Sequence, residues 1–322
     1  MKVDLSIIIV NWNGSELLRR SVESIIRNPP AVAYEIVVID NASSDDSIAL
    51  LHAGELCSAL IARDSLRIIE NVENRGFGRA NNQAFEMTEA PFLFLLNPDT
   101  EITPGSIDRL MSTVKAGARV GAAGPRMLNA DGSLQISVWR NPPAAWEIIL
   151  SQLYFYRLLP RRFRGELLLG GHWDHNRERP VPMLGGAAIL VRRAVIDEVG
   201  GFDERFHMYG EDNEWCLRIA RGGWQMVFQP AALVLHHGAS SSLQRWSKLG
   251  KMRIQLKSNY SFQEQSLPRR RLISNQLASF LTASGQDLWR RLRGIQAPDV
   301  RLARQIHWKH LKRALRKTQV ED

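Results

Sequence analysis

The chain has little cysteine and no long apolar run. Its 322 residues include two cysteines, Cys57 and Cys216, which form neither a metal-ligand spacing nor a disulfide framework. No stretch approaches the about 18 apolar residues of a membrane-spanning helix, and the start MKVDLSIIIV lacks the pattern of a signal peptide. We therefore expect a protein of a reducing cytosol that is not integral to a membrane.

Glycine-rich phosphate loops are also missing. The first apolar run ends at Asn11-Trp12-Asn13-Gly14, which is not the Gly-rich, basic loop that a nucleotidyltransferase uses for a triphosphate. The stretch RGFGRAN follows an expected strand, but Asn81 occupies the position of the third glycine in the dinucleotide fingerprint. These absences disfavour an NAD-binding protein and a nucleotidyltransferase.

The charge is unevenly distributed along the chain. The net charge is +9, yet residues 245–322 hold 18 Lys and Arg against 5 Asp and Glu, which is +13. Residues 1–244 hold 24 basic and 28 acidic residues, which is −4. Hydrophobic content of 44% is ordinary for a globular protein. We predict a mildly acidic domain, residues 1–244, followed by a basic extension, residues 245–322.

The basic extension contains two amphipathic, helix-compatible stretches, residues 245–262 and 267–317, with Trp289 and Trp308 among them. Basic helices with tryptophans suit adsorption to an anionic membrane surface. A solvated helical hairpin packed on its own domain and a dimer surface are the alternatives. No recognised nucleic-acid module accompanies the charge, so we expect no nucleic-acid partner.

Apolar runs alternate with helical patterns through the first hundred residues. Strands are expected at 6–10, 34–39, 66–70 and 92–96, with helices between them, one of them at 47–60. This alternation is typical of βαβ units, so we predict an α/β fold with a mostly parallel central sheet flanked by helices. The unbroken run from Phe92 to Leu96 predicts a central strand that is covered on both faces.

The second half of the acidic domain is less regular. A helix is expected at 106–116, and strands at 120–125, 134–138, 183–192, 224–228 and 233–235. Between them, residues 139–180 form an irregular insertion with a helix-like part at 145–159. Such insertions tend to shape a specific site rather than build a core.

Polar clusters follow five of the expected strands, at Asn11, Asp40, Asn74, Asp99 and His236. The strand ends of a parallel sheet meet at one edge, so these side chains can share one cleft. Asp99 is a hard oxygen ligand that suits Mg²⁺ or Mn²⁺. A metal between this aspartate and a histidine, with a separate free carboxylate, outlines a site that releases a diphosphate while a hydroxyl loses its proton.

Each cluster also has a purely structural interpretation. Asp40 can cap the following turn, and the pair Glu211-Asp212 can stabilise a helix N-terminus. His236 can be an ordinary strand-end histidine, and Gly185-Gly186 can form a bulge. The clusters together, in this order along the chain, favour the functional interpretation.

The motifs that carry a resemblance are SIIIVNWNG, VVIDNASSDDS, ENRGFGRANNQAF, FLFLLNPDTEI, MLGGAAILVRR, GGFDERFHMYGEDNEWCLR and VLHHGASSS. This set, over residues 4 to 245, resembles the family 2 glycosyltransferases, and within them the bacterial rhamnosyltransferase branch. The resemblance implies a GT-A fold, with a Rossmann-like nucleotide-sugar-binding half at 1–104 and an acceptor half at 105–244. It also implies a nucleotide-sugar donor, a divalent cation (Mg²⁺ or Mn²⁺) and inversion at the anomeric carbon.

The same resemblance implies roles for single residues. Asp40 matches the acid that reads the nucleobase, Asp99 the metal ligand that ends the DxD motif, and Asp212 the general base. The residues expected at the donor are Asn11, Asn13, Asp40, Asn74, Arg75, Gly76, Phe77, Asn81, Asn97 and Asp99. Those expected at the acceptor are Gly185, Gly186 and Trp215, those expected in catalysis are Asp212 and Glu211, and those expected at the metal are Asp99 and His236. The adjacent His237 leaves the register of the histidine ligand open.

One position departs from the family pattern. Asn97 stands where the DxD motif has its first acid, which removes a negative charge beside the metal and predicts weaker or more replaceable cation binding. The Asn-Pro-Asp form is usual in the rhamnosyltransferase-like branch.

The resemblance predicts transfer of L-rhamnose from dTDP-L-rhamnose to a hydroxyl of a cell-surface glycan or a polyprenyl-diphosphate-linked oligosaccharide. We expect a cytoplasmic enzyme that associates peripherally with the inner face of the membrane through its basic extension. The nearest alternative is the same fold with a UDP-hexose or GDP-mannose donor. A nucleotidyltransferase and a non-catalytic sugar-binding protein are alternatives of other classes.

Overall fold

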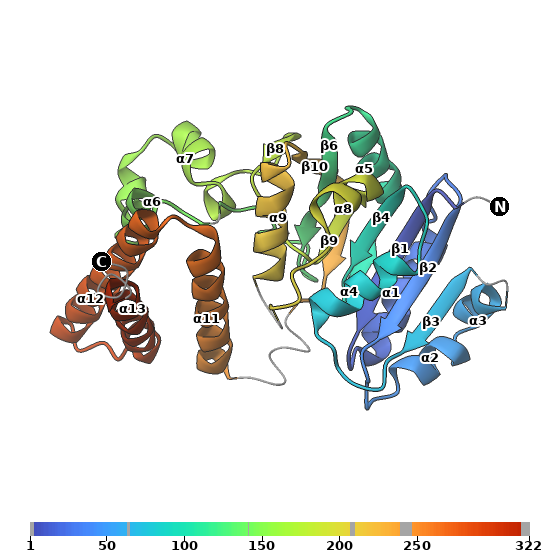
Figure 1. Ribbon diagram of the computed structural model, residues 1–322, viewed down its shortest axis with the longest axis horizontal. Coiled ribbons are helices and arrows are strands. Elements are labelled where there is room, and N and C mark those ends of the chain that lie inside the picture. The colour runs from blue at the N-terminus through green and yellow to red at the C-terminus, as the bar shows by residue number, and fades with distance from the viewer. Residues whose placement is uncertain (1–2, 63–64, 141, 207–209, 239–246, 317–322) are drawn as a thin grey trace. The chain divides into compact units, whose positions relative to one another are not determined.

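The computed structural model describes residues 3–62, 65–140, 142–206, 210–238 and 247–316 (Figure 1). The chain forms two compact units: unit 1 is Met1–Trp139 with His175–Ser241, and unit 2 is Arg140–Asp174 with Ser242–Asp322. The predicted domain boundary between residues 244 and 245 lies outside the described residues. Most of the insertion expected at 139–180 belongs to unit 2 with the C-terminal helices.

Unit 1 is built on one mixed sheet whose described strands run in the order β3-β2-β1-β4-β9-β6-β10-β5, with β7 beside β6 and β8 beside β10. The strands are β1 (Leu5–Asn11), β2 (Tyr34–Asp40), β3 (Leu66–Glu70), β4 (Phe92–Leu96), β5 (Thr100–Ile102), β6 (Val120–Leu128), β7 (Leu134–Gln135), β8 (Arg179–Val181), β9 (Ala188–Arg192) and β10 (Gln225–His236). The four strands β1 to β4 are parallel, as predicted. The sequence did not predict that β9 runs antiparallel between β4 and β6.

Helices cover both faces of this sheet (Figure 1). They are α1 (Ser15–Arg27), α2 (Ser47–Ala53), α3 (Glu55–Ile61), α4 (Phe77–Glu86), α5 (Ser106–Lys115), α8 (Arg193–Val199) and α9 (Glu211–Arg221). Alternate residues of a strand point to opposite faces. Ile7 and Ile9 of β1 accordingly join one core cluster with Leu18 and Ile25 of α1, while α4 packs on β1 and β2 outside that cluster. All of β1 and β4 is buried, as expected for central strands.

Several predicted element boundaries were wrong. The helix expected at 47–60 is two helices separated by Gly54, and the strand expected at 183–192 begins only at Ala188. The two short strands expected at 224–228 and 233–235 are one strand, β10, with a shift of register between Gln229 and Leu233. Pro230, which has no N–H to donate, lies within that irregularity.

Unit 2 is helical in its described residues. It contains α6 (Ala145–Gln152), the 3₁₀ turns η1 (Phe155–Leu158) and η2 (Gly170–His172), α7 (Arg161–Leu168), α11 (Lys248–Ser266), α12 (Arg269–Leu292) and α13 (Pro298–Arg316). The helical conformation predicted for the basic extension is therefore confirmed over these residues, whereas the helix expected at 145–159 ends at Gln152. Asp287 is buried between α12 and α13, with Arg291 at 2.9 Å and Arg304 at 3.4 Å. None of the described helices is both long enough and apolar enough to cross a membrane.

Candidate functional site

The strand ends at one edge of the sheet bring the predicted donor residues together. Asn11, the last residue of β1, pairs in register with Asp40, the last residue of β2. On the other side of β1, Ile9 pairs with Leu96 of β4, so Asn11 is level with the Asn97-Pro98-Asp99 turn that follows. This edge is where open α/β sheets bind their ligands, as expected for these residues.

Asp40 is almost fully buried and its carboxylate organises the first two loops. The side-chain amide of Asn11 donates to Asp40 Oδ1 at 2.7 Å, and the backbone N–H of Ser43 donates to Asp40 Oδ2 at 2.9 Å. The Ser43 hydroxyl accepts the N–H of Asn13, and the Asn13 side chain in turn accepts the N–H of Ser44. The turn-capping interpretation of Asp40 is thus present in the structure, and its role toward a nucleobase stays a prediction.

Asn41 connects these loops to the next one, and sequence analysis missed it. Its side-chain nitrogen donates to Asn74 Oδ1 at 3.1 Å, and its Oδ1 accepts the N–H of Arg75 at 3.0 Å. The Asn74 oxygen also accepts the N–H of Gly76. The partners lie more than 30 residues from Asn41, so no local pattern in the sequence reveals them.

The loop expected beside the diphosphate ends at the N-terminus of α4. Gly76 has φ 84° and ψ 163°, a conformation that is available essentially only to glycine. The Phe77 ring meets the Phe202 ring edge-on at 5.7 Å, which fixes the start of the helix. Arg75 is exposed, whereas Asn81 is buried and donates to the carbonyl of Phe77. Asn81 therefore supports α4 from within.

Asp99 lies beside His236, where the paired strands β5 and β10 end. In the antiparallel pair of β10 and β5, His236 is opposite Thr100. His236 Nε2 is 3.1 Å from Asp99 Oδ1, while His237 Nε2 is 2.7 Å from Glu101 Oε1. Of the two histidine side chains, the one that faces Asp99 is therefore that of His236.

A chain of hydrogen bonds fixes the proton on the His236 ring. The Ser133 hydroxyl donates to Asp131, and this bond lowers the pKa of the Asp131 carboxyl, so that Asp131 accepts. The Ser133 oxygen then accepts from the Asn129 amide, Asn129 Oδ1 accepts from Gln135 Nε2, and Gln135 Oε1 is 2.6 Å from His236 Nδ1. A carboxamide oxygen only accepts, so Nδ1 carries the hydrogen.

This tautomer makes the pair suitable for a divalent cation. In the neutral ring Nε2 carries a lone pair, and it faces an Asp99 oxygen that also carries lone pairs. Two acceptors at this distance require a positive species, which is either a proton on Nε2 or a cation bound by both atoms. Metal-bound histidines commonly donate their second ring N–H to such a partner. Among the described residues, no group of three or more His, Cys, Asp and Glu side chains is arranged so that it could hold a metal ion.

The predicted catalytic carboxylates open α9. Asp212 Oδ1 accepts the backbone N–H and the side-chain amide of Asn213, at 2.8 and 3.1 Å, and Asp212 Oδ2 accepts the N–H of Gly186 at 3.3 Å. Glu211 Oε2 is buried and has no hydrogen-bond partner among the described residues. Burial raises the pKa of both carboxyls, and the nearby Asp212 raises that of Glu211 further.

Hydrogen bonds distinguish the surroundings of the two carboxyls. Those from the backbone N–H groups of Gly186 and Asn213 stabilise the charged form of Asp212 and oppose the rise of its pKa that burial causes. Asp212 is also partly exposed, whereas Glu211 is buried. Asp212 is therefore the carboxylate that a bound molecule can reach.

Two glycines allow the turn before β9 to approach this carboxylate. A Cβ atom on Gly186 would lie 3.3 Å from Asp212 Cβ, and one on Gly185 would lie 3.3 Å from the Trp139 ring. The Trp139 indole N–H donates to the Asn213 side chain at 3.2 Å, so this half-buried ring lies next to Asp212. Sequence analysis did not select Trp139, because its contacts are 74 residues away.

The Asp99–His236 pair and the Asp212 carboxylate belong to the same edge of the sheet. The N–H of Asn97 donates to the carbonyl of Ala187 at 2.9 Å, which continues the pairing of β4 with β9. Asn97 is two residues from Asp99, and Ala187 follows Gly186, which binds Asp212. The expected donor side and the expected acceptor side are thus joined by one backbone hydrogen bond.

Trp215 lies apart from the site. It is fully buried, packs against Phe202 and Phe85 at ring distances of 4.5 and 6.1 Å, and donates its indole N–H to the carbonyl of Gly200. In this structure the ring offers no surface to an acceptor, so we assign it a packing role.

Comparison with known proteins agrees with this arrangement. The model of the family described as "Glycosyltransferase like family 2" matches residues 3–254. The N-acetylglucosaminyl-diphospho-decaprenol L-rhamnosyltransferase of Mycobacterium tuberculosis is 32% identical over 233 residues, which cover 64% of this chain and 67% of that protein. The low-salt glycan biosynthesis hexosyltransferase Agl10 of Haloferax volcanii is 29% identical over 222 residues, which cover 68% and 62%.

A solved structure supports the fold. The mannosyltransferase PcManGT from Pyrobaculum calidifontis, in complex with GDP-Man and Mn²⁺, has a TM-score of 0.58 at 14% identity, covering 100% of this chain and 88% of that one. At this identity the likeness concerns the fold alone, and it confirms the predicted GT-A architecture. Because the family model spans most of the sequence, the chain belongs to glycosyltransferase family 2.

Proposed function

We propose that this glycosyltransferase is metal-dependent and inverting, and that it transfers L-rhamnose from dTDP-L-rhamnose to a hydroxyl of a lipid-linked glycan. The observation that carries the reaction type is the backbone bond from Asn97 to Ala187, which joins the Asp99–His236 pair to the loop that holds Asp212. The reaction needs a site for a cation beside the leaving diphosphate and a carboxylate beside the attacking hydroxyl, on opposite sides of the anomeric carbon.

In the proposed reaction, Asp212 accepts the proton of the acceptor hydroxyl while the hydroxyl oxygen bonds to the anomeric carbon. The bond from that carbon to the diphosphate oxygen breaks on the opposite side, so the configuration inverts. The hydrogen bonds from Gly186 and Asn213 hold the Asp212 carboxylate in place for this transfer. When bound at Asp99 and His236, Mg²⁺ or Mn²⁺ supplies positive charge that stabilises the departing dTDP.

The choice of sugar rests on relatives rather than on contacts. The printed name of the M. tuberculosis relative specifies L-rhamnose and a diphospho-decaprenol acceptor, and that relative is 32% identical to this chain. We extend both features to this protein, with a polyprenyl-diphosphate-linked glycan as acceptor. A UDP-hexose or GDP-mannose donor is the competing proposal, because a solved structure with this fold is a mannosyltransferase in complex with GDP-Man.

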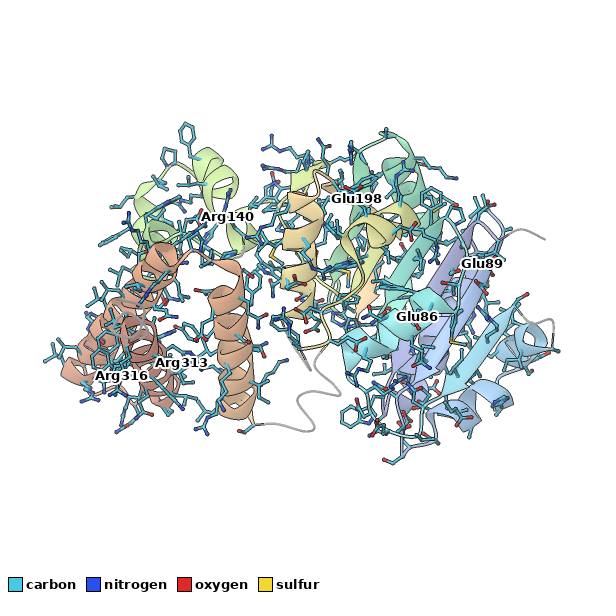
Figure 2. The ribbon with its side chains drawn as sticks, in the orientation of Figure 1. Glu86, Glu89, Arg140, Glu198, Arg313 and Arg316 are labelled. Carbon is cyan, nitrogen blue, oxygen red and sulfur yellow. The ribbon has the colours of Figure 1, made fainter. Side chains whose placement is uncertain are left out.

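A lipid-linked acceptor places the reaction at a membrane surface. We propose that the basic extension, with 18 Lys and Arg against 5 Asp and Glu in residues 245–322, associates peripherally with anionic lipid on the inner face of the cell membrane. Arg313 and Arg316, in the last turns of α13, belong to this charge (Figure 2).

Donor binding tests the proposal directly. Calorimetry and thermal shift with dTDP-L-rhamnose, UDP-glucose, UDP-galactose and GDP-mannose, each with and without Mn²⁺, should show metal-dependent binding of the dTDP sugar alone. Preference for a UDP or GDP sugar would keep the fold and reject the rhamnose assignment. Binding that is indifferent to Mn²⁺ would reject the metal site.

A further inference from the structure

A short segment of unit 2 exposes an unusual amount of apolar surface. We define the 146–163 segment as residues 146 to 163, which comprise most of α6, the turn η1 and the start of α7. Seven of its large side chains are more than a third exposed: Trp146 (48%), Ile149 (39%), Leu153 (37%), Tyr154 (52%), Phe155 (50%), Leu158 (84%) and Phe163 (50%). Apolar exposure concentrated in this way marks an interaction surface rather than ordinary scattered residues.

The segment is anchored in unit 2 by its other face. Ile148 and Glu147 of α6 are buried, and the Glu147 carboxylate accepts the N–H of Ala144. At the two ends of α6, Asn275 donates to the carbonyl of Pro143 at 2.7 Å and Gln286 donates to the carbonyl of Gln152 at 2.6 Å. Both donors belong to α12. These contacts fix one face of α6 against the rest of unit 2, and Trp146 and Ile149 of the same helix remain exposed.

Positive charge accompanies the aromatic rings. The Arg157 guanidinium lies 4.9 Å from the centre of the Tyr154 ring, and that of Arg164 lies 5.9 Å from the Tyr156 ring. Unit 2 as a whole holds 23 Lys and Arg and 8 Asp and Glu residues, a net charge of +15. Aromatic and aliphatic side chains among arginines are the composition of elements that enter the headgroup region of a bilayer.

α12 carries a second apolar row with the same character. Leu281, Leu288 and Leu292 are 56%, 59% and 79% exposed, and they recur at helical spacing. Next to them, the Arg293 guanidinium lies 4.4 Å from the centre of the Trp289 ring. This row belongs to the extension whose charge the sequence singled out, whereas the 146–163 segment does not.

We propose that the 146–163 segment inserts its aromatic and leucine side chains into the headgroup region of an anionic bilayer and anchors the enzyme there. Net charge favours this occupant over a second copy of the chain, because two units of +15 repel each other. The inference deepens the proposed function, since a lipid-linked acceptor resides in such a bilayer. It assigns the apolar part of the membrane contact to the 146–163 segment, which is far from the basic extension in sequence.

Vesicle flotation of the full chain tests the proposal without any sugar. The wild type should float with phosphatidylcholine vesicles that contain phosphatidylglycerol, and remain unbound with phosphatidylcholine alone. The variant Phe155→Ser/Leu158→Ser should lose roughly tenfold or more of its vesicle affinity, because two apolar side chains no longer enter the lipid. The matched control is Leu56→Ser/Met87→Ser, which removes two exposed apolar side chains of unit 1 and should float like the wild type.

Three results would overturn the proposal. The first is unchanged flotation of the Phe155→Ser/Leu158→Ser variant, and the second is an equal loss of vesicle affinity in the control. The third is a dimeric wild type and a monomeric variant, which would identify the segment as a surface between two copies of the chain. If the variant fails to fold, hydrogen–deuterium exchange of the wild type decides, since vesicles should protect residues 145–163. Because the vesicles hold no acceptor, failure here leaves the donor-binding result standing, and the reverse also holds.

Discussion

Gln135 offers a sharp test of the proposed metal binding by Asp99 and His236, because it acts on the His236 ring through one hydrogen bond. Its Oε1 is 2.6 Å from His236 Nδ1, and its amide is oriented by the bond to Asn129. Replacing Gln135 with leucine keeps a similar volume and removes the acceptor. The ring of His236 can then rotate or adopt the other tautomer, which points an N–H at Asp99 in place of a lone pair.

The size of this effect follows from the contact that is lost. One hydrogen bond to the ring is removed while both ligands remain, and losses of this kind typically weaken metal binding about 10- to 100-fold, or about 1.4 to 2.7 kcal/mol. We therefore expect the Mn²⁺ affinity of Gln135→Leu, measured by calorimetry with dTDP present, to fall within that range. Gln135→Glu keeps an acceptor oxygen at Nδ1 and should bind Mn²⁺ at least as well as the wild type.

His237→Gln is the matched control, since His237 directly follows His236 and its Nε2 lies 2.7 Å from Glu101 Oε1. It should leave Mn²⁺ affinity unchanged. Wild-type affinity in Gln135→Leu would refute the argument from the tautomer. A loss in His237→Gln as large as that in Gln135→Leu would refute the assignment of His236 over its neighbour.

Three further changes probe the rest of unit 1. Asp212→Asn should retain donor binding in calorimetry, while the rate of dTDP release falls about 10²- to 10⁴-fold, the usual contribution of a general base. A full rate in this variant would show that Asp212 is not the general base. Burial raises the pKa of Glu211 from 4.5 to about 8, so the wild type should lose stability as the pH rises from 4.5 to 8. Glu211→Gln should have the same melting temperature as the wild type at pH 4 and a higher one at pH 8. Parallel melting curves across this range would contradict a buried, protonated Glu211. Trp215→Ala should lower the free energy of unfolding in urea by about 3 to 5 kcal/mol, because it empties a fully buried aromatic site, and a loss below about 1 kcal/mol would argue against the packing role.

The fold of the first hundred residues could be predicted because its signals are local. The apolar run at β4 and its stop at Asn97 define a buried strand and its end without any distant contact. The reversed strand β9 could not be predicted, because its direction depends on pairing with β4 and β6 on either side. The single strand β10 was predicted as two, since Pro230 reads as a break and only the pairing with β6 carries the strand across it.

The candidate site shows the same division between local and distant information. The resemblance to family 2 glycosyltransferases selected Asp99, His236 and Asp212, and the structure brings the first two together. The choice between His236 and His237 depended on which ring faces Asp99 in three dimensions, which no spacing in the sequence encodes. Gln135 was missed for the same reason, because it is 101 residues from the histidine that it orients.

The composition of the Asp99 site has a consequence for the order of binding. Asn97 is neutral and the His236 ring faces Asp99, so this pair of side chains contributes one negative charge toward a cation. Mg²⁺ and Mn²⁺ take about six ligands and favour oxygen donors, which leaves most positions to water or to the donor diphosphate. A diphosphate carries more negative charge than the protein contributes, so most of the attraction for the cation comes from the donor. The site should therefore bind the cation weakly alone and tightly as a complex with the nucleotide sugar, and Mn²⁺ titrations with and without dTDP separate these two cases.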